Sequence, residues 1–339
     1  MSEEPTDDVD QQVATGALPD PPRVDELVHE AHRRYVDDDD GTVADYIPAL
    51  AQADPELFGL AVVEAAGAVH DAGDAHRLFT IQSISKLFVY ALVVDELGHD
   101  VVRDRVGVNN TGLAFNSVVA IELNDGHPMN PMVNAGAIAT TALVRAASTA
   151  ERWERVREGL SAFAGRQLRL NGEVYRSEAD TNDRNRAIGR LLRSYGRLDG
   201  DPDDVVDVYT RQCALDVDAH DLAVMGATLA DGGVNPVTGE RVVSADVCRD
   251  TLAVVAASGL YERSGEWLFE IGLPAKSGVS GGIVAIAPGK GAIGAFSPRL
   301  DAAGNSVRAR RAIRHLSRAL GLNLFASAPA VAHRREERA

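Results

Sequence analysis

Two stretches with strand character lie near opposite ends of this chain, and helical patterns fill most of the sequence between them. The stretch "FGLAVVEAAGAVHDAG" (58–73) predicts a strand, a turn and a second strand. The segment 266–299 is rich in glycine and β-branched residues and predicts consecutive antiparallel strands. Strands must complete their backbone hydrogen bonds with one another. This order therefore predicts one antiparallel sheet assembled from the two ends of the chain.

The segments outside those strands have the apolar spacing of helices. The stretch "VDELVHEAHRRY" (24–35) places its apolar residues on one helical face, and a final helix is expected at about 306–320. Other helices are predicted at about 83–97, 134–147, 151–164, 182–194, 204–214, 219–230 and 244–257. The expected fold class is α+β, an α/β sandwich. Terminal helices cover an antiparallel sheet, the middle of the chain forms a helical lobe, and the cleft between them is the default site.

The chain of 339 residues is long enough for one domain of two lobes, which we place at residues 23–325. The polar, acidic segment 1–22 and the segment 326–339 are predicted to be disordered tails. The acidic start lacks the basic and apolar parts of a secretory signal, so a cytoplasmic location is expected. The longest apolar stretches are interrupted by polar residues, so no membrane span is expected.

The net charge of the chain limits the kinds of partner that it can bind. A formal net charge of −16 argues against nucleic acid or an anionic membrane surface, because both attract basic proteins. Many aspartates and only three lysines suggest a surface adapted to concentrated salt. Cys213 and Cys248 belong to no Cys-x-x-Cys or Cys/His cluster. They are expected to be buried reduced thiols, and no metal site is predicted.

Ser83 and Lys86 in "IQSISKLF" (81–88) carry the clearest chemical signal. Residues three apart share one face of a helix, so the two side chains can meet while Ser85 points elsewhere. A desolvated lysine can lose its proton and act as a general base, whereas arginine stays charged. The pair therefore predicts a serine nucleophile with a lysine base. A capping serine beside a surface lysine is the alternative for this motif alone.

Two further motifs fit the same chemistry. Lys276-Ser277-Gly278 lies in "PAKSGVSGGI" (274–283), and a Lys-Ser/Thr-Gly strand borders the site of acyl-transfer enzymes of the Ser-x-x-Lys type. Asn134 in "NPMVNAGAIATT" (130–141) is a polar residue at the start of a helix that could face the serine. A glycine-rich packed strand and a helix N-cap are the structural alternatives.

These motifs occur together with "VADYIPALA" (43–51), "TGLAFNSVVAIEL" (111–123) and "SEADTNDRNRAI" (177–188). In this order, over about residues 25–323, the chain resembles the serine-dependent glutaminase family. The resemblance implies a β-lactamase/transpeptidase-like fold and hydrolysis of L-glutamine to L-glutamate and ammonia. It also implies a reaction without metal or organic cofactor and assembly into a homodimer or homotetramer.

The resemblance also implies roles for individual residues, with Ser83 as the nucleophile and Lys86 as its base. The residues that fall where the family binds substrate or assists catalysis are Tyr46, Asn134, Glu178, Asn185, Tyr209, Tyr261 and Val279. We assign Glu178 to the α-ammonium group of the substrate, and Asn134, Asn185 and Tyr46 to its carboxylate and nearby polar atoms. Tyr209 and Tyr261 are candidates for the proton relay, and the sequence leaves open which one is the acid.

Other interpretations of these residues are less specific. Glu178 and Asn185 could simply begin a helix, and Tyr209 could be a core tyrosine. "GKGAIG" (289–294) matches a dinucleotide-binding pattern, but strand and turn residues follow it instead of a helix, so we reject that function and expect Lys290 in an exposed hairpin turn. The alternative functions are a penicillin-recognising serine hydrolase and a catalytically silent amino-acid sensor.

Overall fold

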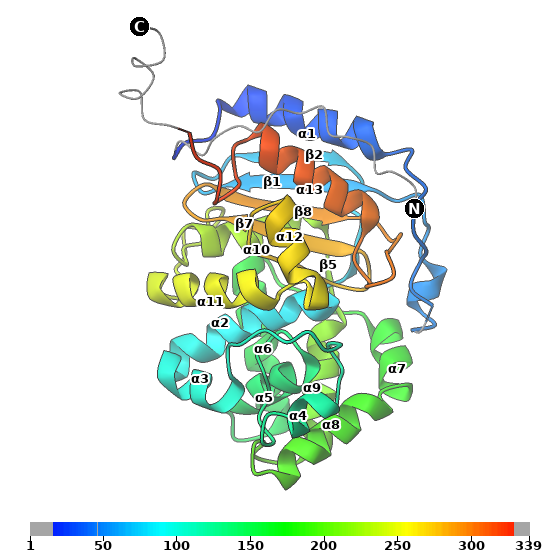
Figure 1. Ribbon diagram of the computed structural model, residues 1–339, viewed down its shortest axis with the longest axis vertical. Coiled ribbons are helices and arrows are strands. Elements are labelled where there is room, and N and C mark those ends of the chain that lie inside the picture. The colour runs from blue at the N-terminus through cyan, green and yellow to red at the C-terminus, as the bar shows by residue number, and fades with distance from the viewer. Residues whose placement is uncertain (1–15, 46, 329–339) are drawn as a thin grey trace, which may run out of the picture.

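A five-stranded antiparallel sheet forms the centre of one half of the molecule (Figure 1). The computed structural model describes residues 16–45 and 47–328. The strands, in sheet order, are β2 (Val69–Gly73), β1 (Gly59–Glu64), β8 (Gly291–Phe296), β7 (Gly282–Ala287) and β6 (Ala275–Ser277). β1 pairs with β8 from Gly59 opposite Phe296 to Glu64 opposite Gly291. The N-terminal hairpin therefore joins the C-terminal strands, which confirms the predicted sheet.

Helices cover both faces of this sheet. The terminal helices α1 (Pro21–Tyr35) and α13 (Val307–Ala319) lie on one face, and α10 (Ala219–Ala230) packs against the other. β1 shows why both faces are covered, because Leu60 and Val62 join the apolar cluster under the terminal helices while Ala61 and Val63 join the cluster around α10. Successive side chains of a strand point to opposite faces, so an all-apolar strand needs a partner on each side.

The middle of the chain forms the predicted helical lobe, which lies below the sheet in Figure 1. Its helices are α2 (Ser85–Leu97), α3 (His99–Val106), α4 (Val119–Glu122), α5 (Asn134–Leu143), α6 (Thr149–Ala164), α7 (Gly172–Asp180), α8 (Asp183–Ser194) and α9 (Pro202–Cys213). Next to the lobe, α11 (Ala245–Ser258) packs against α2, and α12 (Ser264–Glu270) packs against α11. A small sheet of β3 (Phe79–Thr80), β5 (Leu215–Val217) and β4 (Arg169–Leu170) connects the lobe to the region around α10.

The largest error of the sequence prediction is at α12, because part of this helix was assigned to the strands of 266–299. Trp267 is buried in the cluster under the terminal helices and donates to the Leu273 backbone oxygen at 2.8 Å, whereas Phe269 is 90% exposed. A short apolar run fits a strand and a helix equally well by periodicity. The helices α3, α4 and α7 were also not predicted.

The first helix begins slightly before the predicted start of the domain. α1 begins at Pro21, a residue that suits the first turn of a helix, and Leu18 packs against the cluster under the terminal helices. This helix therefore begins before residue 23. The rest of the two predicted tails, 1–15 and 329–339, lies outside the described residues.

Three smaller features were also predicted from the sequence. Cys213 and Cys248 are buried free thiols, as expected. "GKGAIG" forms part of the turn after β7 and the first residues of β8. Lys290 lies in that turn, but it is half-buried and its Nζ donates to the Gly321 oxygen at 2.9 Å. The expectation of an exposed Lys290 was therefore wrong. Within residues 16–45 and 47–328, none of the helices combines the length and apolar composition needed to cross a bilayer.

Candidate active site

A pocket lies where the central sheet meets the helical lobe, and predicted site residues line it. The predicted residues in its wall are Ser83, Asn134, Glu178, Asn185, Tyr209 and Val279. The space in it, with its open mouth included, is about 730 Å³. Lys86 and Tyr261 are buried and contact residues of the same wall, whereas Tyr46 lies outside the described residues.

Ser83 is held in a single 3₁₀ turn, η2 (Gln82–Ile84), between β3 and α2. Gln82, the residue before it, has a φ of 50° in the left-handed region that non-glycine residues rarely adopt. A Cβ placed on Gly278 would come within 3.0 Å of the Ile81 backbone oxygen. The Lys-Ser-Gly segment therefore packs tightly against the serine turn, which favours a small residue at this position of the motif.

Lys86 is buried among uncharged acceptors. Its Nζ donates to Asn134 Oδ1 at 2.7 Å and to the Met132 backbone oxygen at 3.1 Å. Burial lowers the pKa of Lys86 to about 8, although the charges of Cys213 and Glu178 oppose the shift. This is the environment that a lysine needs to become a neutral base.

A second buried lysine, Lys276, lies beside Tyr261 of the site. Its Nζ donates to the Ser277 oxygen at 2.9 Å and sits 4.1 Å from the centre of the Tyr261 ring. Burial, and then the charge of Lys86, holds the pKa of Lys276 well below its usual value. Two of the three lysines of the chain therefore lie in one desolvated region.

Asn134 connects the lysine to the rest of the polar wall instead of capping its helix. It is the first residue of α5, and no side chain of the described residues caps that helix. Its Oδ1 accepts from Lys86 and, at 3.4 Å, from the Tyr209 hydroxyl, while its Nδ2 donates to Asn185 Oδ1 at 2.8 Å. Asn185 in turn donates to Asn182 Oδ1 at 2.6 Å. This chain of amides fixes the orientation of both predicted asparagines.

Glu178, near the end of α7, offers a carboxylate to the pocket. The side chain is partly exposed as a whole, but its Oε2 is shielded from solvent and has no hydrogen-bond partner among the described residues. Burial raises the pKa of Glu178 to about 7, against a hydrogen bond from Gln82 and the charge of Lys86. A shielded carboxylate oxygen without a donor is suited to binding a cation.

The two tyrosines contact different parts of the site. Tyr209 reaches Asn134, and burial raises its pKa well above the usual value. Tyr261 packs its ring 4.7 Å from that of Phe115, and its φ of 58° is also left-handed. Burial raises the pKa of Tyr261 to about 12, and a hydrogen bond with Ser83 opposes that shift. Both phenols therefore keep their protons at neutral pH.

Several residues of the wall were not assigned a role from the sequence. Phe115 and Asn182 occur in the motif strings, and Asn182 stands one helical turn before Asn185, a spacing that could have indicated it. Gln82 borders Glu178, but its left-handed backbone has no sequence signal. Arg184 is an exposed cation of the pocket wall, donating to the Asn116 oxygen at 3.0 Å.

Comparison with known proteins connects this site to a family. A family model described as Glutaminase matches residues 41–325. Glutaminase 2 of Yersinia pestis is 54% identical over 333 residues, covering 97% of this chain and 98% of that protein. The solved structure of probable glutaminase ybaS has a TM-score of 0.90 and 45% identity, covering 91% of this chain and 100% of its own.

A further structure, of Mglu in its L-glutamate binding form in the presence of 4.3M NaCl, has a TM-score of 0.84 and 43% identity. It covers 92% of this chain and 69% of Mglu. Sequence, fold and the polar pocket thus agree with the resemblance carried by the motifs, and the chain belongs to the glutaminase family of amidohydrolases.

Proposed function

We propose that this enzyme hydrolyses L-glutamine to L-glutamate and ammonia through an acyl-enzyme on Ser83. The observation that carries the proposal is the burial of Lys86, which contacts Asn134 in the polar wall that Ser83 and Glu178 also line. The similar protein Mglu has been solved in a form that binds L-glutamate, the product of this reaction. A pocket of the same fold is therefore suited to a free amino acid.

Recognition of the substrate follows from the charges that the pocket provides. The unpaired Oε2 of Glu178 accepts from the α-ammonium group, which supplies the donor that the shielded oxygen lacks. The amides of Asn134 and Asn185, with Tyr46, bind the α-carboxylate and nearby polar atoms. Glu178 and these amides line the same wall, so the amino-acid end of the substrate is held while its side-chain amide reaches Ser83.

The first chemical step forms the acyl-enzyme. Neutral Lys86 removes the proton of Ser83, and Oγ attacks the side-chain amide carbon to give a tetrahedral intermediate. Backbone N–H groups of Ser83 and Val279 stabilise the oxyanion. The intermediate collapses as the carbon–nitrogen bond breaks, and the nitrogen leaves as ammonia after it takes up one proton.

The contacts of the tyrosines favour Tyr261 as the source of that proton. Tyr261 hydrogen-bonds with Ser83, where the leaving nitrogen departs, whereas Tyr209 contacts Asn134. Tyr261 recovers its proton through Lys86, with Tyr209 as part of the hydrogen-bond relay. A water molecule then attacks the glutamyl ester, releases L-glutamate and returns the proton to Ser83.

The test is ammonia release from L-glutamine by purified protein, measured from dilute to molar potassium chloride. We expect turnover in the native protein and its loss in Ser83→Ala. Ser85→Ala is the matched control, because Ser85 lies on the same segment but its Oγ donates to the Gln82 oxygen at 2.8 Å. It should keep most of the activity.

Absence of turnover at every salt concentration, in folded protein, would overturn the proposal. Glutamine binding without turnover would then indicate an amino-acid sensor, and covalent labelling by a β-lactam would indicate a penicillin-recognising hydrolase. Assembly into a homodimer or homotetramer and the cytoplasmic location stay predictions.

A further inference from the structure

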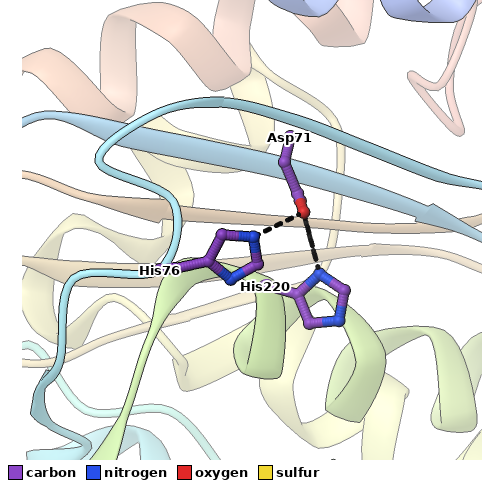
Figure 2. A group of neighbouring side chains, drawn as sticks. All are labelled: Asp71, His76 and His220. Carbon is purple, nitrogen blue, oxygen red and sulfur yellow. Dashed lines mark hydrogen bonds and ion pairs between the residues drawn. The ribbon is translucent and has the colours of Figure 1, made fainter.

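Three side chains from two distant parts of the chain converge outside the active site, at Asp71, His76 and His220 (Figure 2). Asp71 lies on β2, an edge strand of the central sheet, and His76 lies in the connection from β2 to β3. His220 is in the first turn of α10. Figure 2 shows both imidazole rings directed at the same carboxylate.

The distances within this cluster fit one shared metal ion. Asp71 Oδ2 lies 3.1 Å from His76 Nε2 and 3.1 Å from His220 Nδ1. Donor atoms around a tetrahedral Zn²⁺ are about 3.3 Å apart, since each is about 2 Å from the ion. The centres of the two rings are 5.2 Å apart. When two imidazoles bind the same tetrahedral ion, the centres of their rings are likewise about 5 Å apart.

A second carboxylate is placed to orient one of the imidazoles. The other nitrogen of His76, Nδ1, lies 3.5 Å from Asp218 Oδ2. Asp218 is fixed in turn, because it caps α10 and accepts from the Asp221 backbone N–H at 2.7 Å. Histidine ligands of metals commonly donate their second N–H to such a carboxylate, which fixes the ring and its tautomer.

Backbone hydrogen bonds join the two segments that carry the histidines. The N–H groups of Ala219 and His220 both donate to the Ala75 oxygen, at 3.0 Å and 3.3 Å. The segments that carry His76 and His220 are therefore held side by side without the ion. The side chain of His76 is 67% exposed, so an ion and a water ligand can reach the site from solvent.

We propose that Asp71, His76 and His220 bind one divalent transition-metal ion, such as Zn²⁺, with Asp218 orienting His76 and the fourth position left to water. Two imidazoles and a carboxylate are a donor set that such ions prefer. The ion would join the edge strand, the connection that leads toward Ser83, and the start of α10. Its role would be structural, because none of these residues lines the proposed active-site pocket.

The test uses full-length protein without an affinity tag, freed of metal by a chelator and dialysed. Titration with Co²⁺ should give the visible absorption of a low-coordinate cobalt site at one ion per chain, and Zn²⁺ should displace it. His76→Gln and His220→Gln should each weaken Zn²⁺ binding by at least about 100-fold. Asp218→Asn, which can still cap α10, should weaken it by about 10- to 100-fold.

His99→Gln is the matched control, because His99 Nδ1 also lies close to a carboxylate, 3.0 Å from Asp250 Oδ2, but belongs to no such cluster among the described residues. It should bind Zn²⁺ as the native protein does. Thermal unfolding in the presence of chelator should be alike for all variants, and added Zn²⁺ should raise the melting temperature only where the site is intact.

Two results would overturn the proposal, namely no stoichiometric binding by the native protein, or binding that His76→Gln leaves unchanged. The Ser83→Ala protein should bind Zn²⁺ normally. Failure of the metal site and failure of the proposed glutaminase reaction are therefore separate outcomes.

Discussion

At the residue scale, Lys86 shows how burial can make a lysine side chain suitable as a general base. Among the described residues its ammonium group donates to Asn134 and to the Met132 oxygen, and burial lowers its pKa from 10.5 to about 8. Such a shift corresponds to about 3 kcal/mol of bias toward the neutral form. Lys290, which is only half-buried, lies outside this environment.

The pH dependence of turnover should report this bias. Because the proposed base acts in its neutral form, kcat should rise as the pH increases from 7 to 9, through the pKa of Lys86 of about 8. Steady-state ammonia release across this range measures the profile. Lys86→Arg should lower kcat by about 10²- to 10⁴-fold, because arginine keeps its proton, and Lys290→Arg should leave the profile unchanged. A kcat that is flat across the range would contradict Lys86 as the base.

The carboxylate of Glu178 should act mainly on substrate binding. Glu178→Gln keeps the shape of the side chain but removes the charge that pairs with the α-ammonium group. Losing one member of a buried charge pair costs about 2–5 kcal/mol. We therefore expect the KM for glutamine to rise by roughly 100-fold, with a smaller change in kcat.

Glu173→Gln is the control for this prediction, since Glu173 is an exposed glutamate on the same helix, α7. Steady-state kinetics of both variants make the comparison. Equal changes in KM would show that the Glu178 charge does not bind the substrate.

At the scale of secondary structure, close packing between α10 and the central sheet helps to position the active site. α10 lies against β1, β7 and β8, and its Gly226 allows that approach. A Cβ on Gly226 would lie 2.6 Å from Ala292 Cβ and 2.7 Å from Val284 Cγ2. β6, the strand that carries the Lys-Ser-Gly motif, pairs with β7. The distance between α10 and the sheet therefore also affects the position of the serine turn, which packs against this motif.

Gly226→Ala should therefore destabilise the protein although alanine favours helices. We expect the free energy of unfolding to fall by about 1–3 kcal/mol from overpacking. Gly265→Ala in α12 is the control, because a Cβ there meets nothing within 4 Å, and it should not lower stability. Urea unfolding of the two variants gives the comparison, and equal stabilities would show that the α10 interface relaxes freely.

At the scale of the whole molecule, the acidic surface should make stability depend on salt. With a net charge of −16, self-repulsion opposes the compact state in dilute buffer. At about 1 M salt the Debye length falls to about 3 Å, which screens most of this repulsion. We therefore expect the melting temperature to rise from dilute to molar potassium chloride.

Sodium chloride should give a similar increase if screening is the cause. A neutral osmolyte at matched osmolality should reproduce little of it. Thermal unfolding in the three series is the measurement. A melting temperature that is unchanged or lower in molar salt would contradict the hypothesis of a salt-adapted surface.

Much of the fold could be predicted because its signals are local. Apolar periodicity indicated α1, α2 and α10, and the position of strand patterns near both ends indicated the pairing of β1 with β8. Predictions failed where periodicity is ambiguous or short, as at α12. The proposed reacting pair, Ser83 and Lys86, was likewise readable because both residues lie within one turn of chain.

The sequence by itself thus determined the sheet assembled from both ends, the helical lobe between them and the candidate serine and lysine. Only the tertiary structure decided that Asn134 joins Lys86 to Asn185, that Gln82 and Tyr261 take left-handed conformations, and that distant imidazoles meet at Asp71. The physical reason is separation along the chain. Asp71 and His220 are 149 residues apart, and their contact, like the desolvation that shifts the pKa of Lys86, exists only once the elements have packed together.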